Sequence, residues 1–514
     1  MERLSKEPQR GVALRVKFAV CSCTNILVVF LSLSCGDSSS STSNPSNSGF
    51  PPATASLVKL STDTFTNSTS QHATEVEPGS FSFGSTVITS FQVGRIQGGG
   101  GADIGFAVST DGALTWTNGF LPGITTFQGN GTNSAVSDTN VAYDPKHGVW
   151  LISSLPITST NVQVAVSRST DGGSTWANPI VVAQSPGLDK NWLVCDGSTT
   201  SPHYGNCYME WDDNNNGNLI QMSTSTDGGL TWSAALSPLD MPHGLGGQPL
   251  AQPNGTVLVP YLGDAMVPAK IQSFSSNDGG ATWSSSVQVS TVSDHVVAGG
   301  LRSDALPSAQ IDGAGNVYVI WQDCRFRTNC SSNDLVISTT ADGATWTAPA
   351  RIPIDSTTST LDHFIPGLGI DPNTSGSGAH LALTYYYYPV STCTPTTCAL
   401  YAGIISSLDG GQTWSNPTPL AGPMSLGWLP STFSGQMVAD YISTSFVNGK
   451  AYGFFAVATA KSGTTFDQAI YTNQSGMDVV TAQGKHNSAG GQPASSLWSS
   501  RHPRPGALSN LAMR

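Results

Sequence analysis

A phrase of eight residues recurs six times along this chain of 514 residues and limits the folds that the chain can adopt. The copies read STDGALTW, STDGGSTW, STDGGLTW, SNDGGATW, a copy one residue short that ends in DGATW, and SLDGGQTW, and they end at Trp116, Trp176, Trp232, Trp283, Trp346 and Trp414. The tryptophans lie roughly 50 to 70 residues apart, the length of one four-stranded sheet in a repeat protein. The repeat therefore predicts an all-β protein, a single β-propeller of four-stranded antiparallel blades.

Each copy of the phrase reads as a turn between two strands, because β-rich runs precede it and follow it. An aspartate in such a turn accepts hydrogen bonds from the amides of the turn, and glycine adopts the positive φ that other residues resist. The closing tryptophan offers a large apolar surface for packing beside the turn. We therefore expect structural roles for the six aspartates, which are Asp111, Asp171, Asp227, Asp278, Asp342 and Asp409.

The six phrases resemble the Asp-box, or BNR, repeat of the sialidase superfamily, and the resemblance covers most of residues 55–476. Exported bacterial BNR-repeat proteins of unassigned function are similar. The resemblance implies that each box lies in the hairpin between the third and fourth strands of a blade. It implies no particular activity, because hydrolases, binding modules and receptors share the box.

The strand pattern predicts seven blades, with six as the alternative. A further set of three strands follows the last box within residues 437–471 and has no box. We expect residues 56–61 to supply its outer strand, which would close the ring and cover two exposed edges. The propeller then spans residues 55–476, and residues 477–514, which show little hydrophobic periodicity, are predicted to be a disordered tail.

The first residues resemble an export signal. Residues 1–35 combine basic residues with an apolar stretch and end at Cys35, which predicts a signal peptide, of the lipoprotein type, with Cys35 as the lipidation site. A serine-rich tether follows over residues 36–54. We expect an exported lipoprotein of the outer surface or periplasm, held to the membrane by a lipid anchor only. Plain secretion and an uncleaved anchor stay open.

Six cysteines after Cys35 fall in close pairs along the chain. Close pairing in an exported protein favours local disulfides, and the spacing matches no zinc motif. The expected pairs are Cys195 with Cys207, Cys324 with Cys330, and Cys393 with Cys398.

The charge balance limits the partners of the protein. Charged residues make up 11% of the chain and its net charge is −12, which argues against nucleic acid. We expect a monomer whose partner is an extracellular glycan or another polymer. No cofactor is expected to be required.

Antiparallel strand order divides the loops of the blades between two faces. The Asp boxes share one face with the loops between the first and second strands, and all other loops share the opposite face. Polar residues gather in the loops of this second face, and flat rings there are suited to stacking on sugars. The expected ligand-binding residues are Lys190, Trp192, Trp211, His243, Trp321 and His363, with Tyr385 to Tyr388 as either further stacking residues or alternating residues of a strand.

Hydrolysis of a sialoside is the enzymatic alternative. It needs arginines for the sugar carboxylate, a tyrosine nucleophile beside a glutamate, and an acid for the leaving group. The resemblance to sialidases offers Arg95, Arg302 and Arg325 as arginines, Glu210 beside Tyr441 as the nucleophile pair, and Asp103 or Asp440 as the acid. Gln97 stands where those enzymes have a proline, and the arginines depart from their distribution. Glycan recognition is therefore the leading hypothesis, with a glycoside hydrolase or a structural, adhesive surface protein as alternatives.

One loop has the composition of an ion site. Asp212, Asn214 and Asn216 alternate before Gly217, as in the opening of a calcium loop. Ser223 stands where an EF-hand would place its glutamate, so this is not an EF-hand. Calcium binding and a simple asparagine-rich turn are both open.

Overall fold

The computed structural model of the chain describes residue 53, residues 55–263 and residues 268–480. The predicted signal peptide, the lipidation site Cys35, and most of the predicted tether and tail lie outside these described residues. Where the structure is described, strands make up the regular elements and the helical pieces are short 3-10 turns. No helix in these ranges is long and apolar enough to cross a membrane. The all-β prediction is confirmed.

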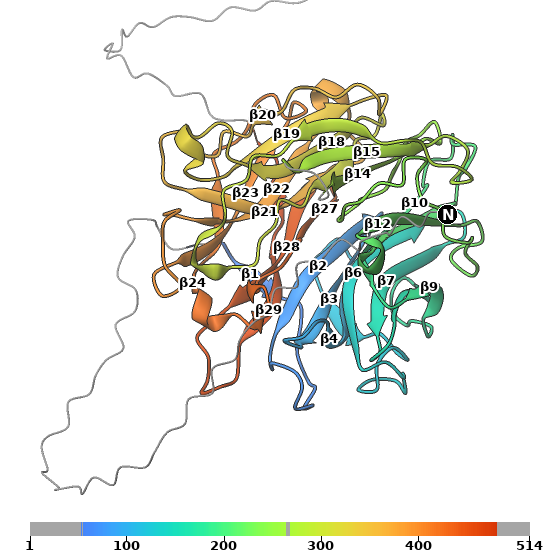
Figure 1. Cartoon of the computed structure of the whole chain (residues 1–514), viewed down its shortest axis with the longest axis horizontal. Helices are drawn as coiled ribbons and strands as arrows, with labels where there is room; N and C mark the ends of the chain where they lie inside the picture. Colours follow the sequence, from blue (N-terminus) through green and yellow to red (C-terminus); the bar gives the residue numbers. More distant parts are fainter. Residues whose placement is uncertain (1–52, 54, 264–267, 481–514) are drawn as a thin grey trace, which may run out of the picture. The chain divides into compact units, whose positions relative to one another are not determined.

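The described strands can be divided into seven successive antiparallel units in chain order, of which units 1 and 2 are joined in one eight-stranded sheet through the pairing of Gly101 with Val136 (Figure 1). Unit 1 consists of β2 (Glu75–Phe83), β3 (Thr86–Arg95), β4 (Gly101–Ser109) and β5 (Thr117–Phe120). Unit 2 consists of β6 (Ala135–Asp144), β7 (Val149–Ile157), β8 (Val162–Ser169) and β9 (Ile180–Ser185). Unit 3 consists of β10 (Leu188–Cys195), β11 (Cys207–Asp213) and β12 (Leu219–Ser225), and a bridge between Met222 and Leu236 continues its outer edge.

The second half of the described chain repeats this order. Unit 4 consists of β13 (Leu250–Ala251), β14 (Val257–Gly263), β15 (Lys270–Ser276) and β16 (Val287–Thr291). Unit 5 consists of β17 (Ser308–Ile311), β18 (Val317–Asp323), β19 (Asp334–Thr340) and β20 (Ala350–Arg351). Unit 6 consists of β21 (Asp362–Ile370), β22 (Leu381–Tyr388), β23 (Ala399–Ser407) and β24 (Thr418–Ser425). Unit 7 consists of β27 (Ser443–Val447), β28 (Lys450–Ala458), β29 (Gln468–Asn473) and β1 (Leu57–Lys59).

Short elements complete the connections between these units. The two-residue strands β25 (Ser431–Thr432) and β26 (Gly435–Gln436) pair with each other. The 3-10 turns are η1 (Asn214–Asn216), η2 (Ala298–Gly300), η3 (Thr328–Cys330), η4 (Gly376–Gly378) and η5 (Leu426–Trp428).

Unit 7 joins the two ends of the described chain in one sheet. Strand β1 pairs antiparallel with β29, and Leu57 lies opposite Asn473. The outer strand predicted from residues 56–61 is therefore confirmed. The first strand, expected near residue 437, instead begins at Ser443, and the residues before it approach the sheet without pairing. Strand β30 (Met477–Asp478) pairs with β28, so the sheet extends beyond the boundary predicted at residue 476.

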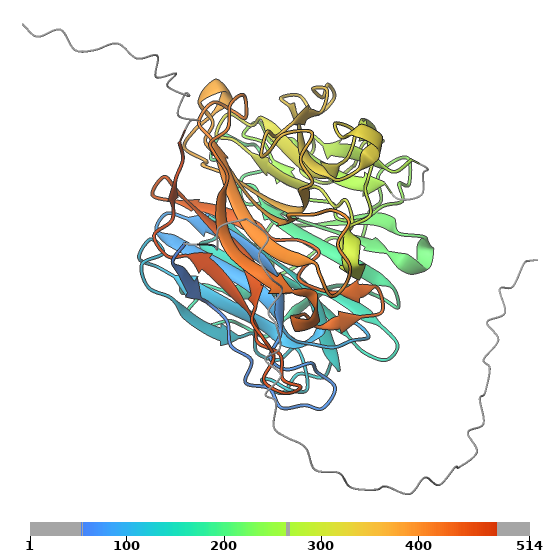
Figure 2. The same cartoon turned by 90° about the vertical axis from the view of Figure 1, so that its left-hand side faces the viewer.

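The first strands of the units contact one another in sequence. β2 contacts β6, β6 contacts β10, β10 contacts β13, β13 contacts β17, β17 contacts β21, and β21 contacts β27. β27 contacts β2 in turn, so the contacts return to unit 1. Figures 1 and 2 show this meeting, with the blue strands of unit 1 beside the orange and red strands of unit 7.

The turns between the first and second strands of all seven units meet around one hollow of about 660 Å³. Each turn contributes at least one lining residue, and these include Gly84, Pro145, Gly197, Pro253, Gly313, Pro372 and Gly449. The units therefore present the same end to a common centre.

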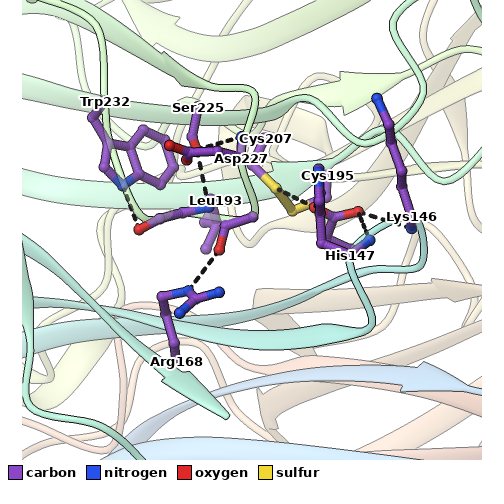
Figure 3. The surroundings of a disulfide bond; sticks show 12 residues. Lys146, His147, Arg168, Leu193, Cys195, Cys207, Ser225, Asp227 and Trp232 are labelled. Atoms are coloured by element: carbon purple, nitrogen blue, oxygen red, sulfur yellow. Dashed lines mark hydrogen bonds and ion pairs between the residues drawn. A yellow bond between two sulfur atoms is a disulfide. The ribbon is translucent and has the colours of Figure 1, made fainter. Parts of the chain in front are cut away.

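The Asp boxes hold their turns with their own side chains, as the box of unit 3 shows (Figure 3). One oxygen of Asp227 accepts hydrogen bonds from Ser225 Oγ (2.9 Å) and from the Thr231 amide (2.9 Å), and the other from Thr231 Oγ1 (2.6 Å). Gly228 has φ 71°, which explains the glycine after each box aspartate. Arg168 Nε of unit 2 donates to the Gly228 carbonyl (2.7 Å), so the box also ties neighbouring units together.

The three expected disulfides are confirmed. They join Cys195 to Cys207, Cys324 to Cys330, and Cys393 to Cys398. The first of them connects the end of β10 to the start of β11, close to the Asp box of the same unit (Figure 3).

Candidate functional site

A cavity of about 410 Å³ lies on the face opposite the Asp boxes. Its walls come from loops between second and third strands and from the approaches to first strands of several units. The charged residues that line it are Glu77, Arg95, Asp138, Asp189, Lys190, Arg302, Asp304 and Asp440. Four of these were predicted as site residues, namely Arg95, Lys190, Arg302 and Asp440.

Three first strands deliver their charged residue to this cavity through the same backbone irregularity. Glu77 in β2, Asp138 in β6 and Lys190 in β10 each lie at a β-bulge. Their φ angles are 57°, 27° and 48°, a region that residues with side chains rarely adopt. A bulge redirects a side chain out of the normal alternation, and strain of this kind collects at functional sites. Ile365 in β21 shares the geometry, with φ 50°, but does not line the cavity.

Glu77 and Asp138 share one hydrogen-bond donor. Gln92 Nε2 on β3 donates to Glu77 Oε2 and lies 3.4 Å from Asp138 Oδ1. Asp138 Oδ1 also accepts from Ser137 Oγ (2.9 Å). Burial raises the pKa of Glu77 well above its usual value, and the charge of Asp138 raises it further. Glu77 therefore holds its proton more tightly than an ordinary glutamate, and it lies beside a second carboxyl group.

Arg302 and Asp440 form an ion pair across the cavity wall. They belong to the approaches to units 5 and 7, and their side chains are 29% and 11% exposed. Burial is the largest single influence and opposes the charge of Arg302, but the acidic neighbours, of which Asp440 contributes most, together outweigh it and raise the pKa of Arg302. The guanidinium is thus already held by a carboxylate.

Arg95 is also committed within the protein. Its side chain is buried, Nε contacts Met437 Sδ (3.0 Å), and Nη1 donates to the Gly100 carbonyl. Burial lowers the pKa of Arg95. It stabilises the cavity wall more than it offers donors to a ligand.

Lys190 lies over an aromatic ring. Its Nζ is 3.3 Å from the centre of the Tyr441 ring, and Trp192 meets the same ring edge-on at 5.3 Å. Lys190 is 6% exposed, and within the described residues its Nζ has no hydrogen-bond partner. Cation–π contacts with Tyr441 and, at 6.0 Å, with Trp192 help to hold this ammonium group.

The predicted pair of Glu210 and Tyr441 is wrong. The Tyr441 hydroxyl donates to the Thr139 carbonyl (3.1 Å) and accepts from the Thr139 amide (2.8 Å). Burial and the charge of Glu77 raise its pKa, which makes it a poor nucleophile. Glu210 is fully buried in β11 against Gly247 and lies outside the cavity lining.

The predicted arginine triad is also wrong, because Arg325 does not line the cavity. Its Nε and Nη2 bind the two oxygens of Asp323 at 2.9 and 2.6 Å, and Nη2 also donates to the Thr291 carbonyl of unit 4. Arg325 therefore connects two neighbouring units. Sialoside recognition by three arginines has no counterpart in this geometry.

Two predicted ligand-binding tryptophans belong to the core. Trp211 and Trp321 are 0% exposed, so neither ring can stack on a sugar. Their indole N–H groups donate to Gln221 Oε1 (3.0 Å) and Asp323 Oδ2 (3.1 Å). The four tyrosines of β22, Tyr385 to Tyr388, are buried as well rather than alternating between core and surface.

The remaining predicted residues also lie away from the cavity lining. His243 is exposed, with Nδ1 2.6 Å from the Gly217 carbonyl, and Asp103 is buried in β4.

His363 is buried beside Asp334 and Asp355. Arg327 contacts these two aspartates at 2.6 and 2.7 Å, and Arg351 contacts Asp334 at 2.8 Å. Guanidinium groups thus neutralise the carboxylates, which favours an ion-pair network over a metal centre.

The oxygen-rich loop forms the 3-10 turn η1. Asp213 caps it by accepting from the Asn215 amide (3.0 Å) and from Asn216 Nδ2 (2.7 Å). Asn214 Nδ2 donates to Asp189 Oδ2 (3.1 Å). The asparagines therefore stabilise the turn themselves, and calcium binding by Asp212, Asn214 and Asn216 stays a prediction.

Sequence reasoning did not include Glu77, Asp138, Asp189 and Asp304 among the predicted site residues. A signal existed for the first, since Glu75, Glu77 and Glu210 are the only glutamates after residue 10, and only the last was singled out. No such signal marks Asp138, whose position depends on the bulge in β6.

Residues 161–366 match the family described as a BNR repeat-like domain. The match confirms the BNR resemblance of the repeated phrases. A search of the curated proteins finds no match to the chain.

Several solved structures are similar to this one at low sequence identity. A Hadza microbial sialidase is 16% identical with a TM-score of 0.41, and the match covers 78% of this chain and 66% of the sialidase chain, just under two thirds. The NanB sialidase of Streptococcus pneumoniae is 13% identical with a TM-score of 0.39, covering 81% and 70%. A polysaccharide lyase, an ulvan lyase, is 12% identical with a TM-score of 0.46, covering 82% and 97%.

Proposed function

We infer that the seven units are the blades of one β-propeller. Support comes from the contacts between successive first strands, which lead from unit 1 to unit 7 and back, and from the seven turns around one hollow. Strand β1 completes the last blade, and full closure of this kind removes exposed sheet edges.

We propose that this protein is exported and binds a saccharide of an extracellular glycan in the cavity opposite the Asp boxes. The observation that carries the proposal is the convergence of carboxylate, ammonium and amide side chains from several units on one cavity of about 410 Å³. Hydroxyl groups of sugars are bound by polar side chains placed in this way. Three disulfides support export, because such bonds persist in oxidising compartments.

The proposed ligand is a neutral sugar rather than an acidic one. Arg302 is paired with Asp440, and Arg95 is bound to Gly100 and Met437. Both guanidinium groups therefore already have partners within the protein, which leaves fewer donors for the bidentate contacts that a sugar carboxylate requires. The five acidic side chains in the lining, against three basic ones, also disfavour an anion.

Binding can be tested with the purified full chain on a glycan array and by calorimetry with neutral and acidic oligosaccharides. Asp304 is exposed and lines the cavity, so Asp304→Ala removes a ligand contact at little cost in stability. We expect it to weaken binding of a neutral oligosaccharide about tenfold. Asp478→Ala on β30, outside the cavity lining, is the matched control and should bind as the wild type.

Two results would contradict this proposal. One is the absence of binding to every glycan, and the other is a preference for sialosides or uronates over neutral sugars. Strong cell–cell adhesion without glycan binding would favour the structural, adhesive alternative.

A further inference from the structure

The cavity contains a pair of carboxyl groups whose arrangement exceeds what sugar binding needs. Gln92 Nε2 is within hydrogen-bond distance of one oxygen of Glu77 and 3.4 Å from one of Asp138. Two oxygens that share one donor nitrogen lie no more than about 6 Å apart. Both residues occupy strained bulges, so neighbouring units hold the pair in place.

The groups that face Glu77 include both acidic and basic side chains. Asp138 and Asp440 are the acidic neighbours, and Lys190, Arg302 and Arg95 are the basic ones. Burial is the largest influence on the Glu77 carboxyl group, and it raises the pKa of Glu77. Asp138 also accepts a hydrogen bond from Ser137 Oγ (2.9 Å), whereas Gln92 Nε2 donates to Glu77 and lies 3.4 Å from Asp138. Two carboxyl groups with different surroundings therefore lie side by side.

Lys190 provides a second, independent sign of a ligand. Its ammonium group is more than nine-tenths buried, lines the cavity, and finds no hydrogen-bond acceptor among the described residues. A buried ammonium group without acceptors is costly to maintain. Oxygens of a bound sugar would satisfy it.

We propose that the cavity hydrolyses the glycosidic bond of a neutral saccharide, with Glu77 as the general acid and Asp138 as the nucleophile. The proposal rests on the saccharide binding proposed above. A carboxyl separation of about 6 Å or less favours the mechanism that retains the anomeric configuration, because an inverting enzyme needs room for a water molecule between the groups.

Every atom in this reaction is accounted for by the two residues, the sugar and water. Asp138 attacks the anomeric carbon while Glu77 gives its proton to the glycosidic oxygen, so the C–O bond breaks and a glycosyl ester forms on Asp138. Glu77, now a carboxylate, removes a proton from water, and the resulting hydroxide attacks the same carbon. The ester bond breaks, and both carboxyl groups return to their starting state.

The full chain should be incubated with reduced oligosaccharides and 4-nitrophenyl glycosides of glucose, galactose, mannose, xylose and arabinose in both anomers. We expect the wild type to cleave at least one, and proton NMR to show a first product with the configuration of the substrate. Glu77→Gln should lower kcat for the oligosaccharide by about 10² to 10⁴-fold. It should affect the nitrophenyl glycoside much less, because nitrophenolate leaves without a proton. Asp138→Asn should abolish cleavage of both.

Glu75→Gln is the matched control for Glu77→Gln. Glu75 lies on the same strand and is equally buried, but it binds Ser61 Oγ (2.8 Å) outside the cavity lining. Its kcat should equal that of the wild type. Labelling of the wild type with a 2-fluoro glycoside, followed by mass spectrometry, should place the sugar on Asp138 and does not depend on the folding of any variant.

The outcomes separate the two proposals. Binding of neutral glycans without hydrolysis of any substrate would overturn the catalytic proposal and leave the binding proposal intact. Absence of binding and hydrolysis would overturn both. Hydrolysis that survives Glu77→Gln on oligosaccharides, an inverted product, or a label on another residue would overturn the assignment of roles.

Discussion

Asp278 and Glu77 are both acidic residues of this sheet protein, but opposite surroundings act on them. Asp278, in the Asp box of unit 4, accepts hydrogen bonds from Ser276 Oγ (2.8 Å) and the Thr282 amide (3.0 Å). Burial is the largest single influence and acts to raise its pKa, but the hydrogen bonds from Thr282 and Ser276 together outweigh burial and lower the pKa of Asp278. Glu77 is buried at a strained bulge, and burial raises its pKa. The box satisfies its charge locally and stabilises the fold, whereas the cavity buries Glu77 and leaves the ammonium group of Lys190 without a hydrogen-bond acceptor among the described residues.

The largest expected effect is a difference in how pH changes the free energy of unfolding through a buried acid and through the Asp-box acids. Burial raises the pKa of Glu75 from 4.5 to about 8, so the folded state binds this proton more tightly than the unfolded state. The stability that the proton confers is complete below pH 4.5 and is lost as the pH rises to about 8, a change on the order of 4 kcal/mol. Glu75→Gln should therefore be more stable than the wild type at pH 9 and similar at pH 4.5, as measured by urea denaturation.

For the Asp boxes, the same measurement should show stability lost at acidic rather than alkaline pH. Hydrogen bonds from the side chain and amide of Thr175 lower the pKa of Asp171 to about 2. The contribution of Asp171 to the free energy of unfolding is present above about pH 4 and is lost as the pH falls through 2. Asp171→Asn should therefore weaken the dependence of stability on pH only on the acidic side. If the free energy of unfolding changed equally with alkaline pH in Glu75→Gln and in the wild type, the contrast between buried acids and Asp-box acids would be contradicted.

A smaller effect is expected from Arg325, which sequence reasoning placed in the site and the structure places between units. Arg325→Ala leaves Asp323, which is 0% exposed, without its cation. We expect the free energy of unfolding to fall by about 2 kcal/mol. Saccharide affinity, measured by calorimetry, should stay within twofold of the wild type. Loss of affinity with unchanged stability would return Arg325 to the site.

The smallest effect is expected at a single Asp box. Asp278→Ala removes the acceptor for Ser276 and Thr282, and the turn keeps its glycines. The thermal transition should shift by the equivalent of about 1 kcal/mol. Binding and hydrolysis should not change, because the box lies on the face away from the cavity. Asp278→Asn keeps one acceptor oxygen and should lie between the alanine variant and the wild type.

The features that were predicted correctly from the sequence depend on residues that are close together along the chain. The Asp boxes and the three disulfides depend on residues a few positions apart, and the structure bears them out. Trp321 was misassigned because its strand is covered on both sides, so a residue that alternation would place at the surface is buried. A sheet that packs between two neighbouring sheets has no face exposed to solvent.

The cavity was harder to predict because backbone irregularities build it. Glu77, Asp138 and Lys190 adopt positive φ without being glycine, and their side-chain directions follow from bulges that no local pattern announces. Register matters as well, since β27 begins six residues after the position expected for it, at Ser443 rather than residue 437. That shift leaves Asp440 on the approach to the sheet, where it meets Arg302.

The pairing of β1 with β29 also determines the order in which this chain can fold. Leu57 and Asn473 lie opposite each other although almost the whole described chain separates them. During synthesis β1 emerges long before β29, so this pairing cannot form until almost the whole described chain has been made. Contacts this distant in sequence slow folding, since a long loop must close before they are made. Until then β1 lacks its partner strand and can pair with another chain, so the waiting time sets the risk of aggregation.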